Sequence, residues 1–183
     1  MRNKSKSRSG LSLVEISVGI AVLVIGVLGF LRAVIQLERM QSRTREAGRA
    51  TEAARRIVQS IQAEAFPEAF RRYNGDPTDD PGGAGTAPGK NFAVAGLSAA
   101  ANDPDGRPGE IIFPTPVGLP GVLRESVIDS RLGMPRDLNG DGVVNNVTNY
   151  ATTYTILPVR VVVDWVGAAG RGHVELRTML SNY

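Results

Sequence analysis

One hydrophobic segment near the beginning of the chain restricts the fold more than any other feature. Residues 11–31 are apolar or small except for one charged side chain, Glu15, and residues 16–31 carry no charge at all. As a helix, these 21 residues extend roughly 31 Å, which is enough to cross the hydrocarbon core of a bilayer. The sequence therefore predicts a single membrane-spanning helix, with the lipid bilayer as its first partner.

The charges around this segment predict its orientation. Arg2, Lys4, Lys6 and Arg8 precede it, and basic residues are typical of the cytoplasmic side of a membrane helix. Residues 1–10 are thus expected in the cytoplasm and the chain after residue 31 outside it. Without those four cations the formal net charge falls from +3 to about −1. The positive net charge of the whole chain is therefore no argument that it binds nucleic acid.

Glu15 has an unusual place for a carboxylate. A charge within a membrane helix costs roughly 2.5–3.5 kcal/mol near the centre of the span and less toward its end. An ammonium at the N-terminus of a neighbouring subunit would neutralise it and would also fix the axial register between subunits. The alternative interpretation is an ordinary signal anchor, in which Glu15 lies among the lipid headgroups and has no partner.

The segment Gly10-Leu11-Ser12-Leu13-Val14-Glu15, after its basic leader, resembles the class III leader of type IV pilins and type II secretion pseudopilins. The resemblance implies that a prepilin peptidase cuts after Gly10. It also implies that Leu11 becomes a methylated N-terminus and that Glu15, then the fifth residue, is the carboxylate used in assembly. The family most often has Phe where this chain has Leu11, which bears on methylation more than on cleavage.

The rest of the chain predicts a pilin-like α+β fold, in which the long N-terminal helix packs against a small antiparallel sheet. We expect a leader at 1–10, a membrane half of the helix at 11–31 and an amphipathic half at 32–66 that Pro67 ends. A variable loop region at 67–110 and a sheet domain at 111–183 follow.

Period-two alternation predicts the strands. The clearest hairpin joins 159–166 to 173–180 around the glycine-rich turn 167–172, and it resembles the carboxyl-terminal hairpin of minor pilins of the PilV or GspI type. Shorter strands are expected at 111–113, 122–128 and 152–157, the last closed by Pro158. Trp165 is expected in the core against the helix, and His173 at the sheet surface.

One loop has the spacing of a calcium site. Asp137, Asn139, Asp141 and Asn145 place oxygen donors at positions 1, 3, 5 and 9 of an EF-hand-like loop at 137–148. The Val143 carbonyl stands at position 7 and Gly142 at position 6. Thr148 replaces the acid expected at position 12, so a carboxylate from elsewhere would be needed: Asp103, Asp105, Asp129 or the pair Asp79 and Asp80. The alternative is an Asn-Gly-Asp-Gly turn that holds no metal.

These patterns favour a subunit over a catalyst, since no Ser-His-Asp arrangement or His cluster is visible. We expect a minor pilin or pseudopilin of the bacterial inner membrane that joins, at its tip, a type IV pilus or a periplasmic type II secretion pseudopilus. Its partners would be other pilins, the prepilin peptidase and the inner-membrane assembly platform. The alternative is a single-pass, calcium-dependent adhesin or surface-binding module that never polymerises.

Overall fold

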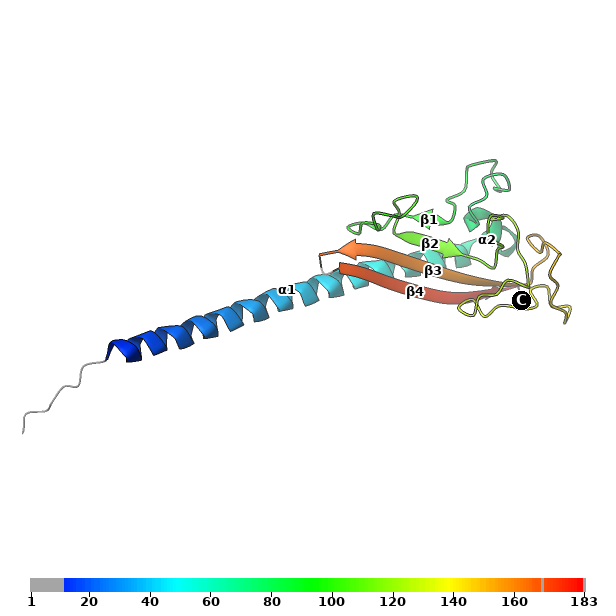
Figure 1. Cartoon of the computed structure of the whole chain (residues 1–183). Helices are drawn as coiled ribbons and strands as arrows, with labels where there is room; N and C mark the ends of the chain where they lie inside the picture. Colours follow the sequence, from blue (N-terminus) through cyan, green and yellow to red (C-terminus); the bar gives the residue numbers. More distant parts are fainter. Residues whose placement is uncertain (1–11, 169, 183) are drawn as a thin grey trace, which may run out of the picture. The chain divides into compact units, whose positions relative to one another are not determined.

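The computed structural model describes residues 12–168 and 170–182. The chain divides into two compact units, Met1–Gln41 and Ser42–Tyr183. Its elements follow in the order α1 (Leu13–Ala63), α2 (Phe66–Tyr73), β1 (Asn91–Phe92), β2 (Gly109–Ile112), β3 (Ile156–Gly167) and β4 (Gly170–Ser181) (Figure 1). This is the α+β layout expected from the sequence, with one long apolar N-terminal helix and a small antiparallel sheet.

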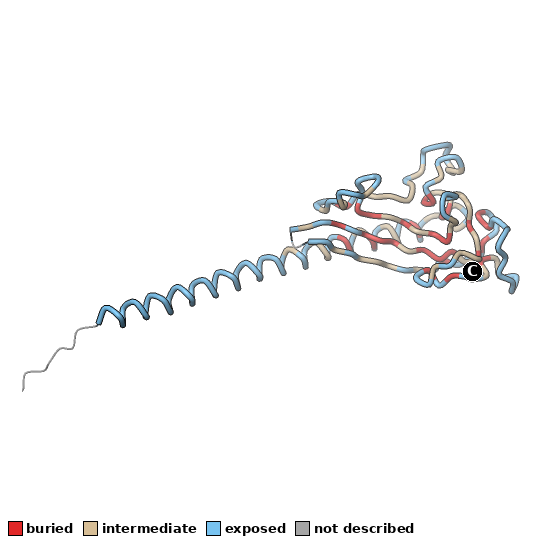
Figure 2. Tube along the Cα trace, in the orientation of Figure 1, coloured by how far each residue is buried: buried red, intermediate tan, exposed pale blue. Residues whose placement is uncertain are grey.

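The first unit contains the apolar half of helix α1, which runs from Leu13 to Ala63. Its most hydrophobic 18-residue window has a mean hydropathy of 2.6, and none of that window is buried (Figure 2). Length and composition therefore make α1 a candidate membrane span. Ser12 caps the N-terminus of the helix, because its side-chain oxygen accepts a hydrogen bond from the backbone N–H of Glu15 at 3.3 Å.

In the second unit, the remaining turns of α1 pack against the sheet through small side chains. Ala50 and Ala54 are completely buried and Ile61 is 1% exposed, a spacing that keeps the three on one helix face. Glu52 and Arg56 form the expected ion pair on the exposed face. Alanine at the contact lets the helix lie close to the sheet.

The end of the helix differs from the prediction. α1 stops at Ala63, and a second helix, α2, spans Phe66–Tyr73 with Pro67 in its first turn. Proline lacks the N–H that a first turn leaves unsatisfied anyway, so it starts a helix as readily as it ends one. Phe70 of α2 is fully buried, with its ring 5.3 Å from that of Phe113.

The sheet has four antiparallel strands in the order β1-β2-β3-β4. They are β1 (Asn91–Phe92), β2 (Gly109–Ile112), β3 (Ile156–Gly167) and β4 (Gly170–Ser181). The hairpin of β3 and β4 is in register throughout, from Gly167 opposite Gly170 to Ile156 opposite Ser181. The turn is therefore tighter than the one expected over 167–172.

Three strand predictions need correction. Residues 122–128 form turns and no strand, because Leu123 is hydrogen-bonded to Asn149 and Tyr150 and its side chain enters the core. The strand expected at 152–157 is wrong at both ends: residues 152–155 lie outside any strand, because β3 begins at Ile156, and Pro158 lies inside β3, opposite Met179. Strand β1 was not expected, since it is only two residues long within a loop rich in glycine and proline.

The faces of the hairpin follow the predicted alternation. Val159, Val161 and Val163 of β3 are at most 1% exposed and face the helix. Trp165 continues that row at 5% exposure and is confirmed as a core residue. Its indole N–H donates to Glu46 of α1 at 3.1 Å, and the backbone N–H of Ala168 donates to the same carboxylate at 3.3 Å. His173, half exposed on β4, is confirmed at the surface of the sheet.

Candidate functional site

The predicted assembly site is only partly described by the structure. Gly10 and Leu11, where the resemblance places cleavage and the new N-terminus, lie outside the described residues. Glu15 lies in the first turn of α1. A carboxylate at this position is favoured by the partial positive charge of the helix N-terminus.

The surroundings of Glu15 are apolar side chains of the same helix. Leu13, Val14, Ile16 and Val18 are all more than half exposed. No ion pair to the Glu15 carboxylate is formed within the described parts of the chain, 12–168 and 170–182. The exposed apolar side chains need an apolar environment, and the Glu15 carboxylate needs a positively charged or hydrogen-bonding partner. Lipid or other protein chains would supply both.

The loop 137–145 is the second candidate site, and its oxygens are held by the backbone. The Asp137 carboxylate accepts hydrogen bonds from the N–H groups of Gly140 at 2.7 Å and Gly142 at 2.6 Å. Both glycines have positive φ angles, +82° and +83°, which other residues rarely adopt. The loop thus curls around Asp137 as the spacing predicts.

The other predicted donors follow the same pattern. Asn139 accepts from the N–H of Asp141, Asp141 accepts from the N–H of Val143, and both bonds fix side-chain oxygens close to the loop. Asn145 accepts from Val147 and Thr148. The hydrogen bonds from Gly142 and Gly140 hold the pKa of Asp137 below its usual value, so this side chain is a carboxylate at neutral pH.

The predicted sources of a further carboxylate are each engaged elsewhere. Asp129 pairs with Arg160 at 3.3 Å. Asp103 lines a cavity together with Trp165, near the end of β3, whereas the loop 137–145 is hydrogen-bonded to Thr155, just before β3 begins. Ten residues of strand separate these points by roughly 33 Å, which excludes Asp103 and its neighbour Asp105 as ligands.

The pair Asp79 and Asp80 is used within its own loop. Asp79 accepts from the Asn74 side chain at 2.9 Å, and Asp80 accepts from the N–H of Ala87 at 3.1 Å. Burial, with the nearby charges of Asp76 and Asp80, raises the pKa of Asp79. Among the described residues, no group of three or more His, Cys, Asp or Glu side chains is placed to hold a metal. The calcium site at 137–145 stays a prediction.

Glu125 is the residue of this site that the sequence did not reveal. Its side chain is completely buried, and its two oxygens accept the N–H groups of Leu138 and Asn145, each at 2.8 Å. Burial and a hydrogen bond to Glu125 raise the pKa of the Tyr150 hydroxyl. One carboxylate therefore holds both ends of the loop. A glutamate within a stretch predicted as a strand gives no sequence signal for such a role.

No family model, curated protein or solved structure matches this chain. Its functional interpretation therefore rests on the residues, on the motif resemblance that they carry and on the geometry.

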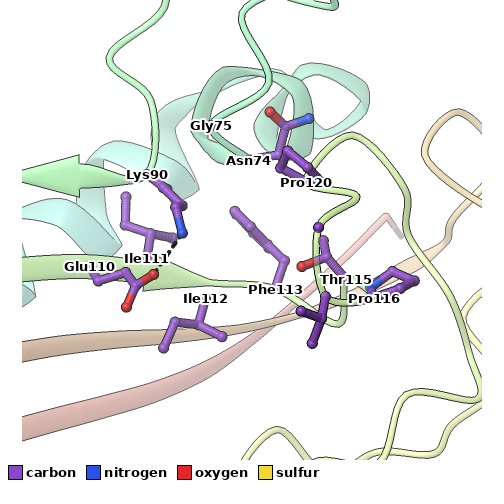
Figure 3. Close-up of a pocket in the computed structure, with 12 residues that line it drawn as sticks. Asn74, Gly75, Lys90, Glu110, Ile111, Ile112, Phe113, Thr115, Pro116 and Pro120 are labelled. Carbon is purple, nitrogen blue, oxygen red and sulfur yellow. Dashed lines mark hydrogen bonds and ion pairs between the residues drawn. The ribbon is translucent and has the colours of Figure 1, made fainter. Parts of the chain in front are cut away.

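A cavity of about 380 Å³ opens beside β2 (Figure 3). The ion pair between Lys90 and Glu110, at 2.8 Å, lies on one side, and Phe113 and Pro116 line another part of the wall. Both members of the ion pair are more than 40% exposed, so water screens their attraction. This arrangement suits packing between loops and offers no activated nucleophile or base.

Proposed function

We propose that this chain is a minor pilin or pseudopilin, a subunit that enters a short helical fibre after its leader is removed. The observation that carries the proposal is the apolar part of α1 with Glu15 in its first turn. The side chains of that segment are exposed, and a lone carboxylate accompanies them. An anchor that only holds a protein in a membrane has no use for that carboxylate.

The physical reason for assembly is charge neutralisation in hydrocarbon. In the fibre, the ammonium of Leu11 of one subunit would lie against Glu15 of its neighbour, and each charge alone would be costly there. From Leu13 to Leu31 the helix spans roughly 28 Å, about the thickness of the bilayer core. The same apolar surface would then pack against equivalent helices of other pilins when the subunit leaves the membrane.

The remaining parts of the proposal follow from the sequence resemblance. Gly10 would be the residue before the prepilin peptidase cut, and the subunit would wait in the inner membrane with its N-terminus in the cytoplasm. The assembly platform would then move it into a type IV pilus or a type II secretion pseudopilus. The domain of residues 42–183 would face outward and contact neighbouring subunits, with a tip position favoured by the resemblance to minor pilins.

The test compares Glu15→Ala and Glu15→Gln with Ser17→Ala in the native host. Ser17 lies within the same turn of α1. Its hydroxyl donates a hydrogen bond back to the Leu13 carbonyl of the same helix, so its loss should leave assembly unchanged. Both Glu15 variants should remain in the membrane fraction but fall at least tenfold in sheared fibres, because neither can neutralise the ammonium. Equal recovery of all three variants would refute the pairing argument.

Intact mass and N-terminal sequencing of the membrane-extracted protein complete the test. A chain that begins at Leu11 supports prepilin processing, with one added methyl if that residue is modified. A chain that begins at Met1 overturns the proposal and favours the uncleaved, calcium-dependent adhesin instead.

A further inference from the structure

The two edges of the sheet differ sharply in how they are protected. At one edge, β1 is two residues long, and the neighbouring backbone is bridged by loop residues such as Ser98, which accepts the N–H of Val166. At the other edge, β4 extends for 12 residues without a bulge in its register to β3. β4 also contains neither proline nor lysine, two residues that commonly protect an exposed edge.

The hydrogen-bonding direction of β4 follows from its register. The N–H of Asp164 bonds to Pro108 and that of Val166 to Ser98, so even-numbered residues of β3 turn toward β2. Odd-numbered residues of β3 therefore turn toward β4 and meet its even-numbered residues. The N–H and C=O groups of Arg171, His173 and Glu175 consequently point away from the sheet, as do those of Arg177. Within the described residues, the backbone of 171–177 hydrogen-bonds to β3 alone.

The side chains along this edge specify what could pair with it. Val174 and Leu176 face the core but are only half buried, because no further strand covers them. On the opposite face, Glu175 is 11% exposed and is already engaged by Arg131, Arg160 and Arg177. The exposed guanidinium of Arg171 and that of Arg177, 57% exposed, leave positive charge at both ends of the segment.

We propose that the free edge of β4 from Arg171 to Arg177 is a docking site for an extended, acidic segment of another protein. The segment adds as an antiparallel fifth strand. Its apolar side chains cover Val174 and Leu176, and two carboxylates six residues apart lie opposite Arg171 and Arg177, roughly 20 Å along the strand. Binding at this edge uses only residues of β4 and does not require assembly into a fibre.

The probe is the heptapeptide Glu-Val-Thr-Val-Thr-Val-Glu, fluorescently labelled, titrated onto the full chain in phosphatidylcholine nanodiscs. Its first, third, fifth and seventh residues lie opposite Arg177, Glu175, His173 and Arg171. Empty nanodiscs control for lipid binding. Saturable binding at peptide concentrations below about 1 mM is expected, as for a short strand-addition ligand. No binding in that range overturns the proposal.

Two modified peptides test the strand geometry without altering the protein. N-methylation of both threonines blocks the N–H groups that face β4 and should abolish binding. N-methylation of the first and third valines blocks groups that face away and should leave most of the binding intact. Equal binding of the two modified peptides contradicts strand addition.

Protein variants test the same edge from the other side. His173→Pro removes a backbone N–H that points away from the sheet and should abolish binding. His173→Ala loses the same imidazole but keeps that N–H, so it should still bind the peptide. Arg171→Glu should weaken the acidic peptide about three- to tenfold and strengthen a version with lysine at both ends. The fluorescence of Trp165, the only tryptophan, reports whether each variant is folded. Dimerisation of the full chain that His173→Pro abolishes would identify a second copy as the occupant and overturn the proposal.

Discussion

Removing the buried carboxylate of Glu125 should destabilise the domain more than any other single change at the loop. Glu125→Ala leaves the N–H groups of Leu138 and Asn145 without their acceptor, and each orphaned donor costs about 1–3 kcal/mol. Truncation of a completely buried side chain also creates a cavity. We expect a total loss of about 3–5 kcal/mol, a fall in Tm on the order of 10 °C.

Glu125→Gln separates the hydrogen bonds from the cavity. The amide has nearly the same volume, but its nitrogen cannot accept the N–H that the second carboxylate oxygen accepts, so a loss of about 1–3 kcal/mol is expected. Glu52→Ala is the matched control, because that glutamate is exposed and its pair with Arg56 contributes less than about 0.5 kcal/mol.

The assay is urea unfolding of the full chain in neutral detergent micelles, followed by Trp165 fluorescence. Trp165 is 5% exposed in the core of the domain and is the only tryptophan in the sequence, so its emission reports the unit 42–183 without a contribution from residues 1–41. If Glu125→Gln and Glu52→Ala have the same free energy of unfolding, the buried carboxylate does not hold the loop as the geometry indicates.

Three further predictions use the same preparation. Glu46→Ala removes the acceptor of the Trp165 indole, so it should cost about 1–2 kcal/mol and change the emission maximum. Calcium should raise Tm, and Asp137→Ala should abolish that rise; an unchanged response would exclude the loop as the site. Burial opposes ionisation of Glu175, yet Arg177, Arg160 and Arg131 together hold its pKa below the usual value. Its contribution to stability is complete above about pH 5 and is lost as the pH falls through the lowered pKa, and Glu175→Gln should flatten that acid-side dependence.

The hairpin could be predicted from the sequence because its signal is local. Val159, Val161, Val163 and Trp165 share one face, and Arg160 and Asp164 between them are ion-paired, although Val162 is also buried. One buried face is enough to fix the register of a strand. The long apolar helix was equally clear, since its length and composition make it a candidate membrane span. The prediction of a strand at 122–128 was wrong because apolar residues in an irregular loop have the same composition as a short strand.

Pro158 shows the limit of a rule applied without its context. Proline has no backbone N–H. It therefore costs a sheet hydrogen bond only at a position where the N–H of another residue would point toward a neighbouring strand. In β3 the N–H of residue 158 would point toward the β2 side, beyond Ile112, which pairs with Arg160 and is the last residue of β2. No β2 partner is lost there, so the strand continues through the proline.

Glu15 and Glu125 are both carboxylates in apolar surroundings, but only one could be recognised in advance. Glu15 is conspicuous because the residues on either side of it in the sequence are uncharged and mostly apolar, so a local pattern is enough to single it out. Glu125 is buried by contacts 13 and 20 residues away, with Leu138 and Asn145, which no local pattern records. A local pattern can thus single out Glu15, whose role in assembly stays a prediction. The calcium prediction took its spacing from 137–145 alone and missed Glu125, the residue that holds that loop in place.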